Sequence, residues 1–151
     1  MPRPLLCCVD DSETARAAAR YARDLSRRLS LELVLVHVAG TADAPGTSAA
    51  PGGHARLADA QREEGEEALA RAARDAGVGE ARRRLEFGSV VGRLLAVAVD
   101  EDAEMIVLGS RGRGRMRAAA LGSVAAETAT KAPCPVLVVS PAAAERAGLA
   151  S

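Results

Sequence analysis

Residues 105–124 read MIVLGSRGRGRMRAAALGSV, and this stretch decides the fold. Its first four residues are apolar, as in a strand that is buried on both faces. Glycines at positions 109, 112 and 114 then interrupt the pattern, and Gly122-Ser123 begins a helix that ends before Pro133. A buried strand that leads through a glycine-rich loop into a helix is typical of an α/β domain with a parallel sheet.

The rest of the chain repeats this alternation of strands and helices. We expect strands at 5–9, 31–38, 83–87, 105–108 and 135–139, and helices at 12–29, 57–76, after Ser89, and at 123–131. The buried face of the first helix is marked by apolar residues at helical spacing, which are Ala18, Ala22, Leu25 and Leu29. Gly77 is the stop signal of the second helix.

The chain is organised as a single domain over residues 1–141 with right-handed crossovers between its strands. Residues 39–56 are rich in Gly, Ala, Pro, Ser and Thr and show no periodicity, so we interpret them as a mobile linker. Residues 142–151 are interpreted as a frayed tail.

Composition excludes several classes of protein. The chain has 151 residues, 48% of them hydrophobic, which is too high a fraction for a disordered chain. Lys and Arg number 20 against 20 Asp and Glu, so the domain as a whole has no charge that would attract nucleic acid or a membrane. Aromatic residues are 1% of the chain, which leaves no platform for stacking nucleic-acid bases. The apolar run at 5–9 is too short for a signal peptide, and we expect a cytoplasmic protein.

The cysteines and histidines give no sign of a metal or catalytic centre. Cys7, Cys8 and Cys134 form no C-x-x-C motif and are interpreted as buried strand thiols. His37 lies in strand sequence without a partner at metal-ligand spacing, so we interpret it as a packed histidine at the end of a strand. We therefore predict neither catalytic residues nor a metal site within the protein.

Ligands of open α/β sheets bind at the carboxyl ends of the strands, where the strand order reverses. The loop after residue 108 has the properties of a phosphate cradle at that edge. Its glycines let an anion approach the backbone, and the following helix presents unpaired amides and a Ser123 hydroxyl. The loop fails the P-loop and dinucleotide-fold patterns, but it matches G-x2-G-x9-G-[ST] at Gly109, Gly112, Gly122 and Ser123.

The arginines at 111, 113, 115 and 117 have two interpretations, as further phosphate contacts or as a solvated edge of the loop. Asp10 and Asp11 follow the first strand, and each can also act as a cap of the first helix. The segment from Gly109 to Ser123 contains no Asp, Glu or Gln. Because fast phosphoryl transfer needs a metal-holding carboxylate and a group that positions water, any hydrolysis should be slow.

The chain resembles the universal stress proteins of the nucleotide-binding type over nearly its whole length. The resemblance rests on VDDS at 9–12, LVHV at 35–38, DAEMIVLGSRG at 102–112, GSV at 122–124 and APCPVLVV at 132–139. It implies a Rossmann-like fold of the adenine nucleotide alpha hydrolase-like type, with five parallel strands in the order 3-2-1-4-5 and helices on both faces. The main departure from the family pattern is Asp11, in a position often filled by Gly or an apolar residue.

The resemblance also implies that the chain binds ATP, with Mg²⁺, and forms a homodimer through its last strand, Val136–Val139. Asp10 and the Val38 backbone would hold the ribose and the adenine, and the loop and helix start would hold the phosphates. The implied nucleotide-binding residues are Asp10, Val38, Leu108, Gly109, Gly112, Gly122, Ser123 and Val124.

Three functions are compatible with this site. The first is a nucleotide-dependent sensor or regulator of a stress response, which another protein reads. The second is a slow ATPase or a self-phosphorylating enzyme with Ser110 or Ser123 as the acceptor. The third, ranked last, is an anion or nucleic-acid binder that uses the basic loop alone, whose binding would fall steeply with salt.

Overall fold

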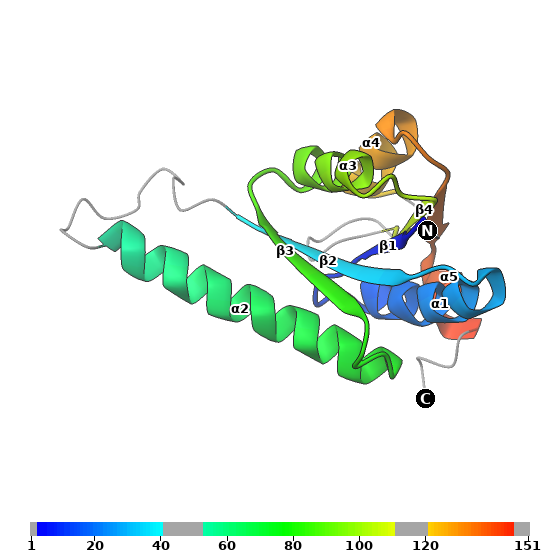
Figure 1. Cartoon of the computed structure of the whole chain (residues 1–151), viewed down its shortest axis with the longest axis horizontal. Coiled ribbons are helices and arrows are strands. Elements are labelled where there is room, and N and C mark those ends of the chain that lie inside the picture. Colours follow the sequence, from blue (N-terminus) through cyan, green and yellow to red (C-terminus); the bar gives the residue numbers. More distant parts are fainter. Residues whose placement is uncertain (1–2, 41–52, 111–120, 147–151) are drawn as a thin grey trace.

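The computed structural model describes residues 3–40, 53–110 and 121–146. Strands and helices alternate along the chain as the sequence predicts (Figure 1). The strands are β1 Leu5–Cys8, β2 Leu33–Ala39, β3 Arg82–Phe87, β4 Met105–Gly109 and β5 Val136–Val139. The helices are α1 Glu13–Leu29, α2 Gly53–Ala76, α3 Val90–Asp100, α4 Ser123–Lys131 and α5 Pro141–Arg146.

The five strands form one parallel sheet in the order β3-β2-β1-β4-β5, which confirms the predicted topology. Leu5 of β1 is level with Leu33 of β2 on one side and with Met105 of β4 on the other. The chain builds outward from β1 to β3 and then crosses to β4. The strand order therefore reverses between β1 and β4, where the crevice of a doubly wound sheet lies.

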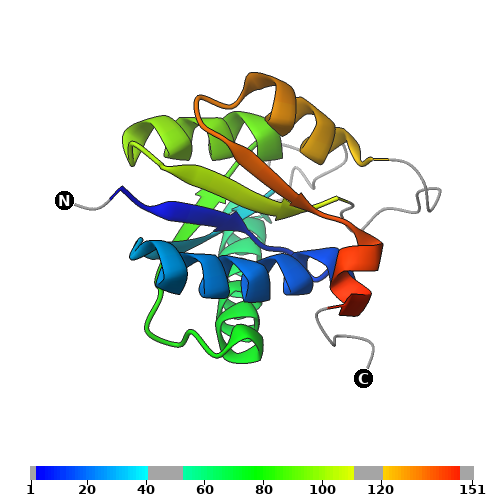
Figure 2. The ribbon, with the colours of Figure 1, turned by 90° about the vertical axis from the view of Figure 1, so that its right-hand side faces the viewer.

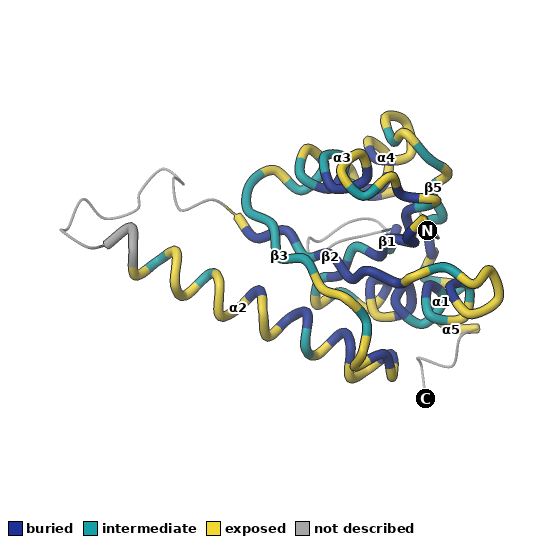
Figure 3. Tube along the Cα trace, in the orientation of Figure 1, coloured by how far each residue is buried: buried dark blue, intermediate teal, exposed yellow. Residues whose placement is uncertain are grey.

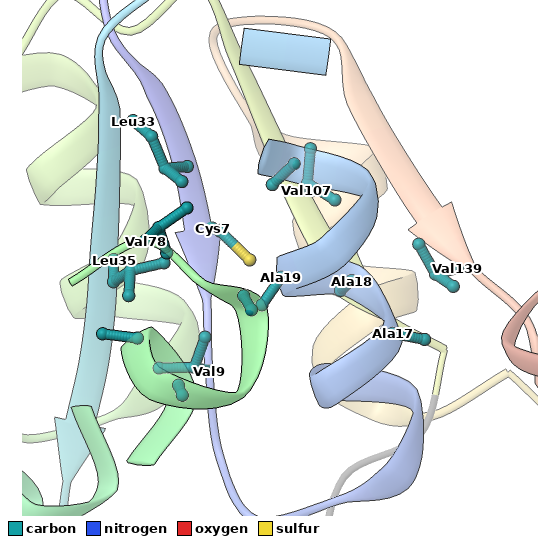
Figure 4. Close-up of a cluster of buried hydrophobic side chains, with 14 of the residues drawn as sticks. Cys7, Val9, Ala17, Ala18, Ala19, Leu33, Leu35, Val78, Val107 and Val139 are labelled. Carbon is teal, nitrogen blue, oxygen red and sulfur yellow. The ribbon is translucent and has the colours of Figure 1, made fainter. Parts of the chain in front are cut away.

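Helices α1, α2 and α5 cover one face of the sheet, and α3 and α4 cover the other (Figures 1 and 2). Successive strand residues point to opposite faces, so each strand contributes to two cores. Cys7 and Val9 pack with the alanines of α1 in the first core (Figure 4), whereas Leu6 lies in the second core with Leu94. Both cores are aliphatic, as the near absence of aromatic residues requires.

Helix α1 begins as the sequence predicts. The Ser12 hydroxyl accepts a hydrogen bond from the Ala15 amide at 3.2 Å and caps the first turn. Ala18 and Ala22 are fully buried, but Leu29, which we assigned to the same face, is 53% exposed. Leu29 is the last residue of the helix, next to its left-handed cap at Ser30, and residues 27–30 at this end of the helix are all exposed.

Two segments contain more helix than the sequence led us to expect. Helix α2 begins at Gly53, within the stretch that we interpreted as a linker up to residue 56. The tail that we expected to be frayed begins with α5, in which Ala144 is buried and the Ala143 carbonyl accepts a hydrogen bond from the Tyr21 hydroxyl at 3.0 Å. Pro141 is the first residue of that helix, and the Ser140 hydroxyl accepts a hydrogen bond from the Ala143 amide at 3.1 Å. The pair Ser140-Pro141 is therefore a helix-start signal that our sequence analysis missed.

Helix α2 also extends past the body of the domain at its N-terminal end (Figure 1). Its C-terminal half is buried through Leu69 and several alanines, while the preceding turns are mostly exposed (Figure 3). Gly77, at φ +68°, ends the helix as predicted because glycine adopts this left-handed conformation without strain. Of the described helices, not one has the length and apolar character to cross a membrane.

The β3 edge of the sheet carries an ion-pair network. Arg82 contacts Glu101 at 2.6 Å and Glu32 at 2.7 Å, and Arg84 contacts Glu101 at 3.0 Å. The Glu101 side chain is only 16% exposed. Its hydrogen bonds with Arg82 lower the pKa of the Glu101 carboxyl from 4.5 to about 2.

This depressed pKa predicts a contribution to stability that acid removes. A carboxyl whose pKa is lower in the folded state stabilises the fold above its unfolded pKa of 4.5 and loses this effect as the pH falls toward 2. Between pH 5 and pH 2.5, we expect the free energy of unfolding to fall by roughly 2 kcal/mol more in the wild type than in Glu101→Gln. Denaturant titrations at each pH measure this difference. Glu127→Gln, which removes an exposed pair with Lys131, is the control, and equal pH slopes for wild type and Glu101→Gln would exclude the effect.

Candidate functional site

The carboxyl ends of β1, β2 and β4 meet at one edge of the sheet and form the candidate site. Cys8, Val38 and Leu108 stand at these ends, and all three belong to the core beneath α3 and α4 or pack against it. Their side chains therefore lie on that face of the sheet. Leu108 is 3% exposed and Val38 8%, so they give this edge an apolar floor.

A cavity of about 280 Å³ opens at the end of β2. The strand ends contribute most of its wall, Val90 adds the start of α3, and α2 closes the remaining side with Gln61, Glu64 and Gly65. Cys8 also lines it. Burial, with the nearby Asp10 carboxylate, raises the pKa of the Cys8 thiol to about 12, which favours the neutral thiol over the thiolate.

The backbone of Val38 faces this cavity with unused hydrogen-bonding groups. In a parallel sheet, the N–H and C=O groups of one residue point to the strand on one side, and those of the next residue point to the strand on the other side. The Val36 carbonyl accepts from the Val9 amide at 2.8 Å, and the Ala39 carbonyl accepts from Gly88 at 3.0 Å. The N–H and C=O of Val38 must therefore point toward β1, which has already ended at Cys8. Among the described residues they have no backbone partner on that side.

Asp10 follows β1 and lies beside Val38 in the wall of the cavity. One of its carboxylate oxygens, Oδ1, accepts a hydrogen bond from the Ser12 amide at 2.7 Å, which fixes the turn into α1. Asp10 thus supports the helix start without being its cap, since Ser12 holds that position. No hydrogen bond to its second oxygen, Oδ2, is present among the described residues.

Two further residues shape this end of the site. The His37 ring carries a hydrogen on Nδ1, because that atom lies 2.8 Å from the Val9 carbonyl, which can only accept. His37 is therefore a packed strand-end histidine, as predicted, and the described part of the chain contains no group of residues suited to a metal. Gly65 was not singled out from the sequence. A Cβ there would meet the Leu85 side chain, at 3.3 Å from Cδ2 and closer to Cδ1, so its absence lets α2 approach the sheet.

The other end of the site is the start of α4. Its N-cap is Gly122, which has no side chain to bond the first-turn amides. The amides of Ser123 and Val124 therefore stand unpaired at the positive end of the helix, as described residues offer them no partner. Gly122 itself is different, because its amide donates to the Ser110 carbonyl at 2.7 Å. The Gly122 amide is therefore not free to bind a phosphate. Gly122 shapes the start of α4 through its lack of a side chain.

Ser110 joins β4 to this helix start. Its amide donates to the Val139 carbonyl at 2.9 Å, and its own carbonyl holds Gly122. The side chain is 5% exposed, and its Oγ has no hydrogen-bond partner among the described residues. A buried hydroxyl without a partner is costly, so its presence beside unpaired amides fits a site that a polar ligand completes.

Gly109 has a structural role that the motif does not indicate. A Cβ on this residue would lie 2.7 Å from the carbonyl carbon of Thr14 and 2.8 Å from the amide nitrogen of Ala15. Both atoms belong to the backbone of α1, so Gly109 is needed for the close approach of β4 and α1. Gly112 and the arginines at 111, 113, 115 and 117 lie outside the described residues, and their roles stay predictions.

Asp11, which departs from the family pattern, does not line the cavity at the end of β2. It forms an ion pair with Arg71 of α2, whose Nη2 lies 2.9 Å from Oδ1 and 3.1 Å from Oδ2. The sequence offers Asp11 or Ser12 as the cap of α1, and Ser12 holds that position. The partner is 60 positions away in the sequence, and no local pattern announces such a contact.

Comparisons with known proteins agree with this architecture. The model of the universal stress protein family matches residues 1–140. Universal stress protein MJ0531 of Methanocaldococcus jannaschii is 30% identical over 133 residues, which cover 86% of this chain and 77% of that protein.

Solved structures show the same fold. The universal stress protein UspA from Lactobacillus plantarum superposes with a TM-score of 0.77 at 24% identity, over 92% of this chain and 99% of that one. The universal stress protein from Archaeoglobus fulgidus in complex with dAMP gives a TM-score of 0.63 at 23% identity, over 90% of this chain and 96% of that one.

The packing of Gly109 leads to a stability prediction. In Gly109→Ala the new methyl group must displace backbone of α1, so we expect the free energy of unfolding to fall by about 1–3 kcal/mol. Gly79→Ala is the matched control, because a Cβ at Gly79 meets nothing within 4 Å. Denaturant unfolding followed by circular dichroism measures both variants. A Gly109→Ala protein as stable as the wild type would refute the packing role.

Proposed function

The chain belongs to the universal stress protein family, and we propose that it binds an adenine nucleotide at the carboxyl edge of its sheet and acts as a nucleotide-dependent sensor or regulator. The preferred ligand is ATP with Mg²⁺, and the compartment is the cytoplasm. The observation that carries the proposal is the pair of unsatisfied backbone sites at one edge, Val38 at one end and the start of α4 at the other.

The two ends suit the two ends of a nucleotide. A peptide N–H beside a C=O can donate to N1 of adenine and accept from its 6-amino group, whereas guanine presents the reverse pattern. The unpaired amides of Ser123 and Val124 suit phosphate oxygens, and the orphan Ser110 hydroxyl can add a donor. Asp10, between these ends, suits the ribose hydroxyls. The dAMP bound by the Archaeoglobus fulgidus protein supports this class of ligand.

Binding is favoured over turnover. The segment from Gly109 to Ser123 supplies no carboxylate or glutamine that could hold a metal or orient water. Mg²⁺ would be held mainly by the phosphates themselves, as is common for this ion. The protein would therefore act through occupancy, because a ligand shifts a conformational equilibrium by its differential affinity for two states. Slow hydrolysis or self-phosphorylation is the alternative activity.

The β5 edge gives the proposed homodimer its surface. Val136–Val139 has an apolar sequence and three partly exposed residues, while the opposite edge, β3, is occupied by charged side chains and their ion pairs. The carbonyls of Pro135 and Val139 bond toward β4, so the peptide groups of Val136 and Val138 face outward and have no partner among the described residues. An apolar strand with free outward peptides invites a second copy.

The phosphate end is tested by Ser123→Pro. Proline is tolerated at the first position of a helix, and Gly122 before it is already extended, with φ −63° and ψ 155°. The substitution removes one amide and one hydroxyl from the site while α4 is kept. We expect affinity for AMP and for ATP–Mg²⁺ to fall at least tenfold by calorimetry, because hydrogen bonds to a charged group are strong.

Ser123→Ala, which keeps the amide, serves as the control and should lose less affinity. Thermal unfolding of both variants should match the wild type. If Ser123→Pro binds both nucleotides as tightly as wild type, the phosphates do not lie at the start of α4.

The dimer is tested by Val138→Pro. The N–H of Val138 points outward and does not contribute to the pairing of β5 with β4. The sheet should therefore persist, while pairing between the β5 strands of two copies is lost. Light scattering should show a dimer for the wild type and a monomer for the variant. A dimeric variant, or a wild type that is monomeric at high concentration, counts against the β5 interface.

A further inference from the structure

A second and larger cavity, of about 660 Å³, lies between α1 and α2. These helices cover the face of the sheet opposite to α3 and α4 (Figures 1 and 2). Asp10 lines both cavities, but the remaining residues of this one are not in the wall at the end of β2. They are Asp11, Ala15, Arg16, Ala68, Arg71, Ala72, Arg74 and Asp75.

The floor of this cavity is apolar. Ala15, Ala68 and Ala72 are 4%, 6% and 7% exposed and present only methyl groups. Such small side chains on two facing helices leave the space unfilled. The volume is in the range of sites that take whole small molecules, and a flat apolar group can lie against this floor.

The charged rim has more unused donors than unused acceptors. The side chain of Arg16 has no hydrogen bond or ion pair with any described residue. Arg71 engages Asp11 through Nη2 alone, which leaves its other nitrogens available. Arg74 contacts Glu67 only at 3.4 Å, between exposed side chains.

Each carboxylate of the rim has at least one contact, although that of Asp75 is about as long as that of Arg74, and one oxygen of Asp10 has no described partner. Asp11 is bound by Arg71, and Asp75 lies 3.5 Å from Arg20. Oδ1 of Asp10 accepts from the Ser12 amide. The free hydrogen-bonding capacity of the rim is therefore mainly that of guanidinium groups, which bind phosphate and carboxylate oxygens well.

We propose that the cavity between α1 and α2 is a second binding site, for a small organic anion that joins a phosphate or carboxylate group to a flat apolar part. The anionic group contacts Arg16, Arg71 and Arg74, and the apolar part lies on the alanine floor. This site shares Asp10 with the cavity at the end of β2, but its other lining residues are different.

The probe for this site is 1-naphthyl phosphate, and 1-naphthol is the uncharged control. The chain has no tryptophan and one tyrosine, so naphthyl fluorescence is measured against a low background. We expect saturable binding of the phosphate and at least fivefold weaker binding of the naphthol. Arg16→Gln should weaken binding of the phosphate at least fivefold. Arg28→Gln, in an exposed residue of the same helix, should leave binding unchanged.

Two further measurements test that the probe binds on the alanine floor and not in the proposed nucleotide site. Ala72→Leu fills the floor and should abolish binding while circular dichroism shows an intact fold. In the wild type, saturating AMP should leave the probe bound. Complete displacement by AMP, unchanged affinity in Arg16→Gln, or no binding to wild type at millimolar probe would each overturn the proposal.

Discussion

The site depends on backbone groups that the sheet leaves unpaired at its carboxyl edge. Strand β1 ends at Cys8, and its last ladder bond runs from Val9 to Val36, while β2 continues to Ala39. The peptide groups of Val38 therefore have no strand to pair with. Because buried peptide groups need partners, an edge built in this way needs solvent or a ligand to satisfy them. The amides of Ser123 and Val124, which have no partner among the described residues, likewise need solvent or a ligand.

The glycines of the site serve different purposes although they share one motif. Gly109 permits the contact between β4 and the first turn of α1. Gly122 leaves the start of α4 without a capping side chain, and its own amide holds Ser110. Gly65, which the motif does not include, lets α2 approach the sheet and close the cavity. A spacing pattern shows that small residues are required but does not show what each one contacts.

Local patterns were enough to predict the elements that begin or end with a strong signal. The capped start of α1, the glycine stop at Gly77 and the bounds of α4 follow from the sequence, and the parallel sheet follows from the alternation of elements. The strand order came from the family resemblance. Contacts between distant residues could not be predicted, because no local pattern encodes Asp11 with Arg71 or Thr14 with Gly109. For the same reason, the sequence marked Gly122 as a phosphate ligand and gave no sign that Ser110 binds its amide.

We propose that one nucleotide spans Val38 and the start of α4, and amide chemical shifts test this binding mode most directly. In a titration of the ¹⁵N-labelled protein with ATP–Mg²⁺, we expect the largest shifts at the amides of Val38, Ser123 and Val124. The amide of Gly122 should move less, since it is already bonded to Ser110. Saturable shifts confined to α1 and α2, with those three amides unmoved, would contradict the claim.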